Sequence, residues 1–447
     1  MKQIASIDVP ARQRRAIGSD LFGARLPSLL ALLLVGLAGC RFHDNILGDN
    51  AHDGGPTSGT CEVSGQTYPV GATVLLSPCT SCVCQADATL RPCENTCPSG
   101  NGGVLGSAGG MGGAASNPSG AAGAGGSSVI AAGDRLPCDI YAADGGPCVA
   151  AHSTVRALSS AYAGPLYQVR KSDGTTRDIG VLAPGGFADA AAQDAFCGPD
   201  ACFIALIYDQ SGYGNHLAKA PAGQAKSTPA NEANANILPI TIGGHNVYGL
   251  HVTPGVGYRN NQAHGTSTGD DPETIYMITS GDFHNAGCCF DYGNAETNSV
   301  DAGEGAVEAV YFGSCTIWGK GAGDGPWVMA DLENGLWAGD QSPYLANTSV
   351  AFKYVTGMVK GDKAFTNHWT LKVANAQAGA LKTMFDGQRP SPRYVPMKKQ
   401  GAIILGTAGD NSNAAQGNFF EGVMTAQYAS DAADEAVQAN IASVYGR

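Results

Sequence analysis

Short apolar or alternating runs recur along the chain from Leu136 onward, separated by turns rich in glycine, asparagine, aspartate and proline. Runs of about 4 to 8 residues bounded by such turns are typical of β-strands. With little helix between them, they predict an all-β fold, a two-layer β-sandwich of jelly-roll type, rather than alternating strands and helices. The clearest runs are Cys202–Tyr208, Ile237–Ile242, Val247–Val252, Ile275–Thr279, Val307–Phe312, Trp327–Leu332, Ala351–Met358, Trp369–Val373, Ala402–Leu405 and Phe419–Met424.

Two helices are expected in the same part of the chain. In each, a serine stands where the N-cap belongs, and apolar residues follow at helical spacing. Both helices are interpreted as structural. Ser153 would cap the first helix, which carries Val155, Leu158 and Tyr162. Ser430 would cap the second, which carries Val437, Ile441 and Val444.

Residues 1–39 have the features of a bacterial lipoprotein signal peptide. Arginines precede an apolar run, Leu26 to Leu37, that is too short to span a bilayer as a mature helix. The run leads into the tripeptide Ala-Gly-Cys40, which resembles a lipobox, so we expect cleavage before Cys40 and lipidation of that residue. Residues 40–60 would then be a tether, and the protein an exported lipoprotein of the outer membrane or cell surface. An ordinary secretory signal with an incidental cysteine is the alternative.

Residues 61–98 form a separate, cysteine-rich segment. It has too few apolar residues for a stable core of its own, so its cysteines imply three disulfides. The spacing C-x2-C-x-C followed by C-x3-C-P resembles half of a von Willebrand factor type C module. A zinc site is the alternative, but the cluster contains no histidine, and export favours disulfides. Residues 99–133, rich in glycine, alanine and serine, predict a flexible linker to the main domain at 134–447. The cysteines of the segment are Cys61, Cys79, Cys82, Cys84, Cys93 and Cys97.

Composition supports an extracellular, loop-rich protein. The chain of 447 residues has 63 glycines, 14 cysteines and only 14% charged residues. Its formal net charge is −12, and removing the basic signal segment makes the mature chain more negative. Such a surface repels phosphate backbones, so nucleic acid is not an expected partner.

Candidate chemistry first appears in "GPWVMADLENGLWAG", residues 325–339. If Trp327–Glu333 is a strand, its period of two places Asp331 and Glu333 on one face with two large apolar side chains, just before an Asn334-Gly335 turn. A solvated strand face is the alternative. Nearby tryptophans favour a sugar site, because aromatic walls commonly surround carboxylates there; they are Trp318, Trp327 and Trp337.

A second candidate segment is "IILGTAGDNSNAAQG", residues 403–417, where an apolar strand runs into a polar loop headed by Asp410. Such a loop suits function, although an aspartate in this kind of turn is more often an Asx-type turn residue, so the signal alone is weak. The turn Tyr208–His216 is interpreted as structural. The chain has no G-x-S-x-G elbow and no H-E-x-x-H, so neither a serine hydrolase nor a zinc hydrolase is supported.

From the residues alone, Cys288 and Cys289 are two buried thiols, a metal pair or an adjacent disulfide.

The segment from about Cys138 to Gly446 resembles the catalytic domain of α-L-arabinofuranosidases of glycoside hydrolase family 54, the arabinofuranosidase B type. The resemblance implies a β-sandwich and retaining removal of terminal α-L-arabinofuranosyl groups, with no metal or organic cofactor. The matching strings are "PCDIYAADGGPCVAAHSTVRALSSAY", "YDQSGYGNHL", "GYRNN", "GCCFDYGNAET", "WVMADLENGL" and "GAIILGTAGDNSNAAQGNFFEGVM".

The resemblance also assigns roles by position. Glu333 matches the nucleophile and Asp410 the general acid/base, which a retaining enzyme holds about 5–5.5 Å apart. Residues that match the sugar pocket are Asp331, Asn334, Trp318 and the backbone at Gly409. Disulfides are implied for Cys138–Cys148, Cys197–Cys202 and the adjacent pair Cys288–Cys289, the last as a small, rigid plate in the pocket wall. Cys315 has no partner in this scheme.

The expected partner is therefore a plant cell-wall polysaccharide, arabinan or arabinoxylan, or an arabino-oligosaccharide, bound by a monomer that contacts the membrane through its lipid anchor only. A catalytically silent lectin or adhesin built on the same sandwich is the alternative function. A hydrolase of another sugar, such as β-D-xylose or galactofuranose, is also left open, because one or two pocket contacts set such preferences.

Overall fold

The computed structural model describes residues 60–63, 66–70, 73–77, 80–85, 90–95, 135–363 and 367–447. The chain divides into two units, Met1–Ala121 and Ala122–Arg447, which are described separately. The predicted signal peptide, Cys40, the tether except Thr60, and the glycine-rich linker lie outside the described residues.

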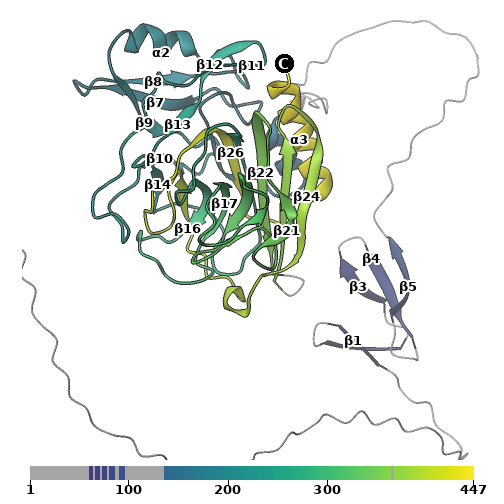
Figure 1. Cartoon of the computed structure of the whole chain (residues 1–447). Helices are drawn as coiled ribbons and strands as arrows, with labels where there is room; N and C mark the ends of the chain where they lie inside the picture. Colours follow the sequence, from purple (N-terminus) through teal and green to yellow (C-terminus); the bar gives the residue numbers. More distant parts are fainter. Residues whose placement is uncertain are drawn as a thin grey trace, which may run out of the picture. The chain divides into compact units, whose positions relative to one another are not determined.

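The described residues of the smaller unit form short antiparallel strands (Figure 1). β1 (Thr60–Val63) pairs with β2 (Gln66–Pro69), and β3 (Thr73–Ser77), β4 (Thr80–Cys84) and β5 (Leu90–Asn95) form a three-stranded sheet. The side chain of Cys84 is buried and disulfide-bonded. Because the side chains of the other cysteines in this segment lie outside the described residues, the three-disulfide arrangement stays a prediction.

Two antiparallel sheets, drawn in Figure 1, build the larger unit and confirm the predicted all-β sandwich. The first sheet has, in spatial order, β20 (Leu336–Trp337), β19 (Trp327–Asp331), β17 (Glu308–Gly313), β16 (Asp291–Ala295), β25 (Ala402–Leu405), β14 (Tyr258–Asn260), β10 (Leu217–Lys219), β9 (Cys202–Ile207), β7 (Pro165–Lys171) and β8 (Thr176–Gly180). The second has β13 (Leu250–Val252), β26 (Gly417–Thr425), β15 (Glu273–Ser280), β22 (Tyr354–Asp362), β23 (His368–Asn375) and β24 (Ala378–Gln388), with β6 (Cys148–Ser153) also paired to β26.

Smaller elements complete the larger unit. β11 (Pro239–Ile242) and β12 (His245–Tyr248) form a hairpin, and β18 (Gly321–Ala322) pairs in parallel with β21 (Tyr344–Thr348). The helices are α1 (Pro137–Ala143), α2 (Ala190–Cys197), the short 3-10 helix η1 (Pro392–Tyr394) and α3 (Asp431–Tyr445). Among the described residues, no helix is long and apolar enough to cross a membrane.

Strand alternation decides which side chains enter the core between the sheets. On β17 and β19, Val310, Phe312, Val328 and Ala330 belong to the main apolar cluster, whereas their neighbours Tyr311 and Met329 belong to a second cluster on the opposite face. The sheets approach closely where β22 has Gly357, since a Cβ there would lie 2.9 Å from a Val328 methyl and 3.0 Å from a Val310 methyl. The first sheet therefore has an inner, core face and an outer face.

The two predicted helices have different outcomes. α3 is confirmed: the Ser430 hydroxyl accepts the N–H of Ala433, and Val437 and Ile441 are buried. The helix after Ser153 is wrong. β6 continues through Ser153, whose hydroxyl accepts the N–H groups of Val155 and Arg156, so this serine closes a turn instead of capping a helix.

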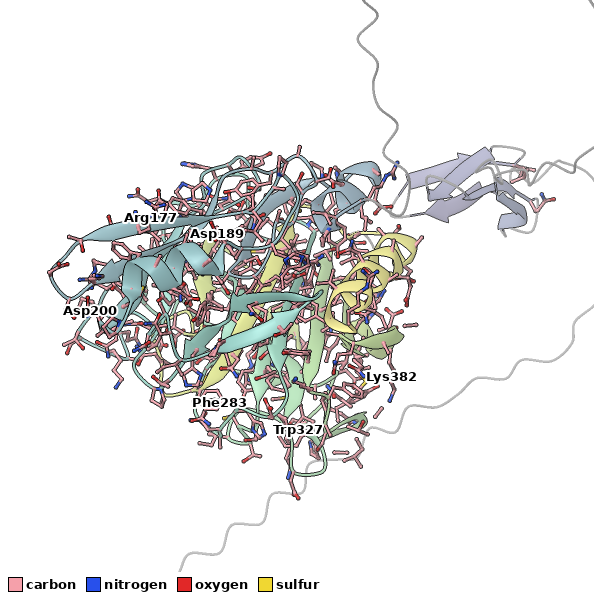
Figure 2. All side chains as sticks on the ribbon, turned by 90° about the horizontal axis from the view of Figure 1, so that it is seen from above. Arg177, Asp189, Asp200, Phe283, Trp327 and Lys382 are labelled. Atoms are coloured by element: carbon pink, nitrogen blue, oxygen red, sulfur yellow. A yellow bond between two sulfur atoms is a disulfide. The ribbon has the colours of Figure 1, made fainter. Side chains whose placement is uncertain are left out.

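All the predicted strand runs lie on observed strands, with boundaries that differ by a few residues. Val247–Val252 is divided at Gly249 into β12 and β13, and the run Ala351–Met358 begins three residues before β22. In Figure 2, the label Arg177 marks β8, the last strand at one end of the ten-stranded sheet, and Trp327 marks β19, the last but one at the other end.

One buried ion pair ties β26 to the turn that follows β6. The Arg156 guanidinium donates two hydrogen bonds of 2.7 Å to Glu421, and both side chains are nearly inaccessible to water. Arg156→Met would leave an unpaired buried carboxylate and should lower the free energy of unfolding by about 3–5 kcal/mol, measured by urea denaturation. The matched control is Lys171→Met, which breaks a more exposed pair with Asp200 and should cost less than about 1 kcal/mol. Equal losses for both variants would contradict this assignment.

Candidate active site

A row of directly paired residues crosses the outer face of the ten-stranded sheet. From one end it contains Arg259 on β14, Ile404 on β25, Gly293 on β16, Ala309 on β17 and Asp331 on β19. Paired residues on neighbouring strands share a face of the sheet. The three middle residues have no polar side chain, so the row is an apolar floor with a cation at one end and a carboxylate at the other.

Glu333 lies in the tight turn between β19 and β20, not on the strand. β19 ends at Asp331, and Glu333 and Asn334 have positive φ values of 63° and 55°. The prediction of a strand through Glu333, followed by an Asn334-Gly335 turn, is therefore wrong: the strand ends two residues earlier. An Asp331 carboxylate oxygen accepts the Glu333 N–H at 2.9 Å, and the Tyr394 hydroxyl donates to the Glu333 carbonyl at 3.2 Å. These contacts hold a backbone conformation that is unfavourable for a side chain such as glutamate.

Asp410 lies on a loop that folds back over the floor after β25. One of its carboxylate oxygens accepts the Ser412 N–H at 2.8 Å, so the Asx-type turn considered from the sequence is present. The backbone at Gly409 lies so close to the Glu296 carboxyl group that a Cβ at this position would overlap with it. Ala408, one residue earlier, packs with Tyr311 and Met329 on the outer face. Asp410 is thus held above the same face that carries Asp331.

The adjacent cysteines form a disulfide, as do Cys138–Cys148 and Cys197–Cys202. Backbone hydrogen bonds join the adjacent pair to the Asp410 loop: Cys289 N–H donates to the Ser412 carbonyl at 3.3 Å, and Ala414 N–H donates to the Cys288 carbonyl at 3.1 Å. A carboxylate oxygen of Asp331 lies within 4.8 Å of both sulfurs. Cys315 is a buried free thiol in the same apolar cluster as Cys289.

These segments enclose a pocket of about 210 Å³. Of the predicted site residues, Cys288, Trp318, Asp331, Glu333, Asn334 and Asp410 line it. Cys289 and Gly409 do not; both are buried behind the lining. Trp327 and Trp337 are also absent from the lining, because they pack in apolar clusters. The remaining lining residues are Asp301, Gly335, Leu336, Ala408 and Ser412.

A larger groove of about 560 Å³ lies elsewhere, between α2, the β11–β12 hairpin and Tyr354. Its lining has a single carboxylate, Asp194, which accepts a hydrogen bond from the Tyr248 hydroxyl. The predicted loop Tyr208–His216 is likewise structural: the Asp209 carboxylate accepts the N–H groups of Ala151, Ser211 and Asn215. Neither region has the paired carboxylates of the smaller pocket.

Negative charge is concentrated in the smaller pocket. Burial, together with the carboxylates of Asp331, Glu296, Asp301 and Asp410, raises the pKa of Glu333 to about 10. Burial likewise raises the pKa of Asp331 to about 7. Each carboxyl group therefore stays protonated, and so uncharged, to a higher pH than it would in water.

Two further carboxyl groups lie under the pocket and were not singled out from the sequence. Asp291 and Glu296 are fully buried, and burial raises the pKa of each. Carboxylate oxygens of Glu296, Asp301 and Glu333 lie within 4.8 Å of one another, an arrangement of the kind hard cations accept. Here the buried guanidinium of Arg259 supplies positive charge beside Glu296, Glu333 and Asp410. The only sequence signal for these residues was their presence in "GCCFDYGNAET" and "GYRNN".

Comparison with known proteins is consistent with this geometry. The sequence profile of the family described as "Alpha-L-arabinofuranosidase B, catalytic" matches residues 137–445. The chain belongs to the arabinofuranosidase B family. A probable α-L-arabinofuranosidase B from Aspergillus terreus is 54% identical over 321 residues, which cover 70% of this chain and 62% of that protein.

Two crystal structures of the arabinofuranosidase family are also similar to this chain. One is a family 54 α-L-arabinofuranosidase soaked with a cyclic sulfate inhibitor, at 51% identity and a TM-score of 0.67. The other is an arabinofuranosidase complexed with arabinofuranosyl-α-1,2-xylobiose, at 50% identity and the same TM-score. Each match covers 69% of this chain and 65% of the solved one. This chain therefore spans less than two thirds of the length of these relatives.

The raised pKa of Glu333 should reduce stability at neutral and alkaline pH, because the carboxyl group ionises more readily in the unfolded chain than in the folded protein. In the unfolded chain glutamate ionises near pH 4.3, whereas in the folded protein the pKa is raised, so folded stability is lost as pH rises above about 4. Glu333→Gln removes this group and should raise the midpoint of thermal unfolding at pH 8 but leave it nearly unchanged at pH 4. The control is Asp340→Asn, at an exposed carboxylate. A Glu333→Gln protein that is less stable than wild type at pH 8 would contradict the expected sign.

Proposed function

We propose that the protein hydrolyses terminal α-L-arabinofuranosyl groups from arabinan, arabinoxylan or related oligosaccharides, with retention of configuration. The observation that carries this proposal is the convergence of Glu333 and Asp410, from loops after two different strands, on one small pocket. At about 210 Å³ the pocket is smaller than the ~300–1,000 Å³ of typical drug-sized ligand sites, so it suits a single terminal sugar ring. A relative's complex with arabinofuranosyl-α-1,2-xylobiose supports this substrate class.

The chemistry follows from two carboxyl groups with different tasks. In the first step a carboxylate oxygen of Glu333 bonds to the anomeric carbon, the glycosidic C–O bond breaks, and Asp410 transfers its proton to the leaving oxygen. In the second step Asp410 accepts a proton from water, whose oxygen attacks the anomeric carbon and releases Glu333. Arabinose leaves with its original configuration, and both carboxyl groups regain their starting protonation.

The crowded carboxylates favour this reaction electrostatically. Near the transition state the sugar ring carries partial positive charge, which an Asp331 carboxylate stabilises without having to reorient. The same crowding raises the free energy of an ionised Glu333, and forming the neutral glycosyl ester relieves that repulsion. We assign hydroxyl recognition to Asp331 and Asn334, and packing against the ring to Trp318 and the Cys288–Cys289 disulfide.

The direct test is hydrolysis of 4-nitrophenyl α-L-arabinofuranoside by wild type, Glu333→Ala and Asp410→Ala, with proton NMR to follow the configuration of the first-formed arabinose. Wild type should cleave the substrate with retention. Glu333→Ala should lose at least about 10³-fold in kcat. Asp410→Ala should lose about 10²- to 10⁴-fold in turnover, as expected for a removed acid/base.

Controls for this test separate the competing functions. 4-Nitrophenyl β-D-xylopyranoside reports whether the sugar preference differs from the proposal. A wild-type protein that binds arabinose in calorimetry but releases no nitrophenol would support the lectin function and contradict the hydrolase. Inverted first-formed product would contradict the nucleophilic role of Glu333.

We also propose that the protein is anchored at the outer membrane or cell surface through a lipidated Cys40, on the basis of the signal-like residues 1–39 and the lipobox-like sequence. Wild type expressed in a lipoprotein-processing bacterium should partition into the detergent phase of a Triton X-114 extract, and Cys40→Ser should not. Mass spectrometry of the N-terminal peptide should find an acylated Cys40. Equal partitioning of the two proteins would contradict the anchor.

A further inference from the structure

Arg259 is a buried cation that the proposed chemistry has not used, and it is hydrogen-bonded to the loop that carries Asp410. It lies on β14, in the motif "GYRNN", and only 3% of its surface is exposed. Burying an arginine is costly unless its five N–H donors are satisfied. Because its paired neighbour across the sheet is Ile404, its side chain leaves the sheet on the outer face, toward the loops that surround the pocket.

The guanidinium is hydrogen-bonded to backbone carbonyls of two separate loops. Nη1 donates to the Gly409 carbonyl at 2.5 Å and more weakly to Ala408 at 3.4 Å. Nη2 donates to the carbonyl of Glu296, and Nε donates to the side chain of Asn261. The loop after β25 and the loop after β16 are therefore fastened to one planar group.

The bond to Gly409 bears directly on Asp410. The carbonyl of Gly409 belongs to the peptide group whose nitrogen is that of Asp410, so the guanidinium fixes the orientation of this peptide plane. On the far side, the Asp410 carbonyl accepts the N–H of Ala225 at 3.0 Å. The Asp410 backbone is thus held on both sides, and its short side chain has little freedom to correct a displaced main chain.

Arg259 also supplies charge without forming a direct ion pair. Among the described residues, no carboxylate lies within salt-bridge distance of its guanidinium, and its four acceptors are neutral. It nevertheless interacts electrostatically with Glu296, Glu333 and Asp410. Burial lowers the pKa of Arg259 to about 10, although these three carboxyl groups act to raise it. At that value it stays a cation at neutral pH.

We propose that Arg259 is the positioning residue for the acid/base carboxyl: it holds the Gly409 carbonyl and the Glu296 loop together, so that Asp410 reaches the leaving oxygen of the bound glycoside. The inference rests on the proposed hydrolase function. It assigns Arg259 to leaving-group protonation, not to sugar binding or to the nucleophile. Its positive charge also stabilises the carboxylate that Asp410 becomes after giving its proton to the leaving oxygen.

The test uses the dependence of kcat/KM on the leaving group. A 2,4-dinitrophenolate leaves without protonation, whereas a benzyl alkoxide requires it. For Arg259→Met and Arg259→Lys, kcat/KM should fall by about 10²- to 10⁴-fold on benzyl α-L-arabinofuranoside, as expected for a lost general acid. On the 2,4-dinitrophenyl glycoside the fall should be less than about tenfold. Asp410→Ala is the reference for this pattern, and Glu333→Gln should lose activity on both substrates.

Azide gives a second, independent readout. It attacks the glycosyl-enzyme without needing a base, so it should accelerate turnover of the dinitrophenyl glycoside by the Arg259 variants and yield arabinofuranosyl azide. Wild type, which has a positioned base, should respond little. Arg177→Met, at an exposed arginine on the distant strand β8, is the matched control and should retain wild-type behaviour in both assays.

The outcomes separate the possibilities. Equal losses on the two leaving groups, or no response to azide, would make Arg259 a purely structural residue and overturn the inference. Wild-type activity in both Arg259 variants would overturn it as well. If Arg259→Met does not fold, the Arg259→Lys protein tests the inference. Lysine keeps the positive charge but cannot donate hydrogen bonds from three fixed nitrogens to Asn261, Gly409 and Glu296 at once. Wild type inactive on both glycosides would instead contradict the proposed function.

Discussion

The structure depends on holding several carboxyl groups close together in a largely buried place. Glu333 and Asp331 are less than a tenth exposed, and Asp291 and Glu296 are fully buried. Left unbalanced, such repulsion would drive the loops apart. The protein opposes it with a rigid floor of paired strands, with backbone hydrogen bonds that fasten each loop, and with one buried guanidinium between them. The site is therefore a strained arrangement supported by an unstrained sandwich, a common relation between active sites and their scaffolds.

The sandwich supplies this support because its two faces have different tasks. Side chains such as Val310 and Val328 fill the core between the sheets, and their strand neighbours Tyr311 and Met329 pack on the outer face, on the side of the pocket. A shift of one residue in strand register would exchange these two sets of side chains. The same register that packs the core therefore places Asp331 and Arg259 on one face, four strand spacings apart, which is roughly 19 Å at the usual ~4.8 Å per step.

The sequence predicted the strands well and the site only in part. Apolar runs such as Ala402–Leu405 are local signals, and the resemblance placed Glu333 and Asp410 in functional segments. The bend at Glu333 was missed because a left-handed conformation is unfavourable for glutamate, and the contacts that hold it come from Asp331 and the distant Tyr394. Arg259 and Glu296 were missed for a related reason. Their roles depend on burial and on carbonyls from loops far away in the chain, and neither is visible in local residue patterns.

The hydrogen bonds between the Cys288–Cys289 disulfide and residues 412–414 make two segments, more than a hundred residues apart in sequence, into one mechanical unit. A loop exchanged between homologous enzymes to alter substrate preference would have to bring both segments together. Transplanting either one alone would leave the acid/base loop attached to a backbone of a different shape. Sequence variation in these two segments is accordingly expected to be correlated: among related enzymes, a change in one loop should be accompanied by a change in the other.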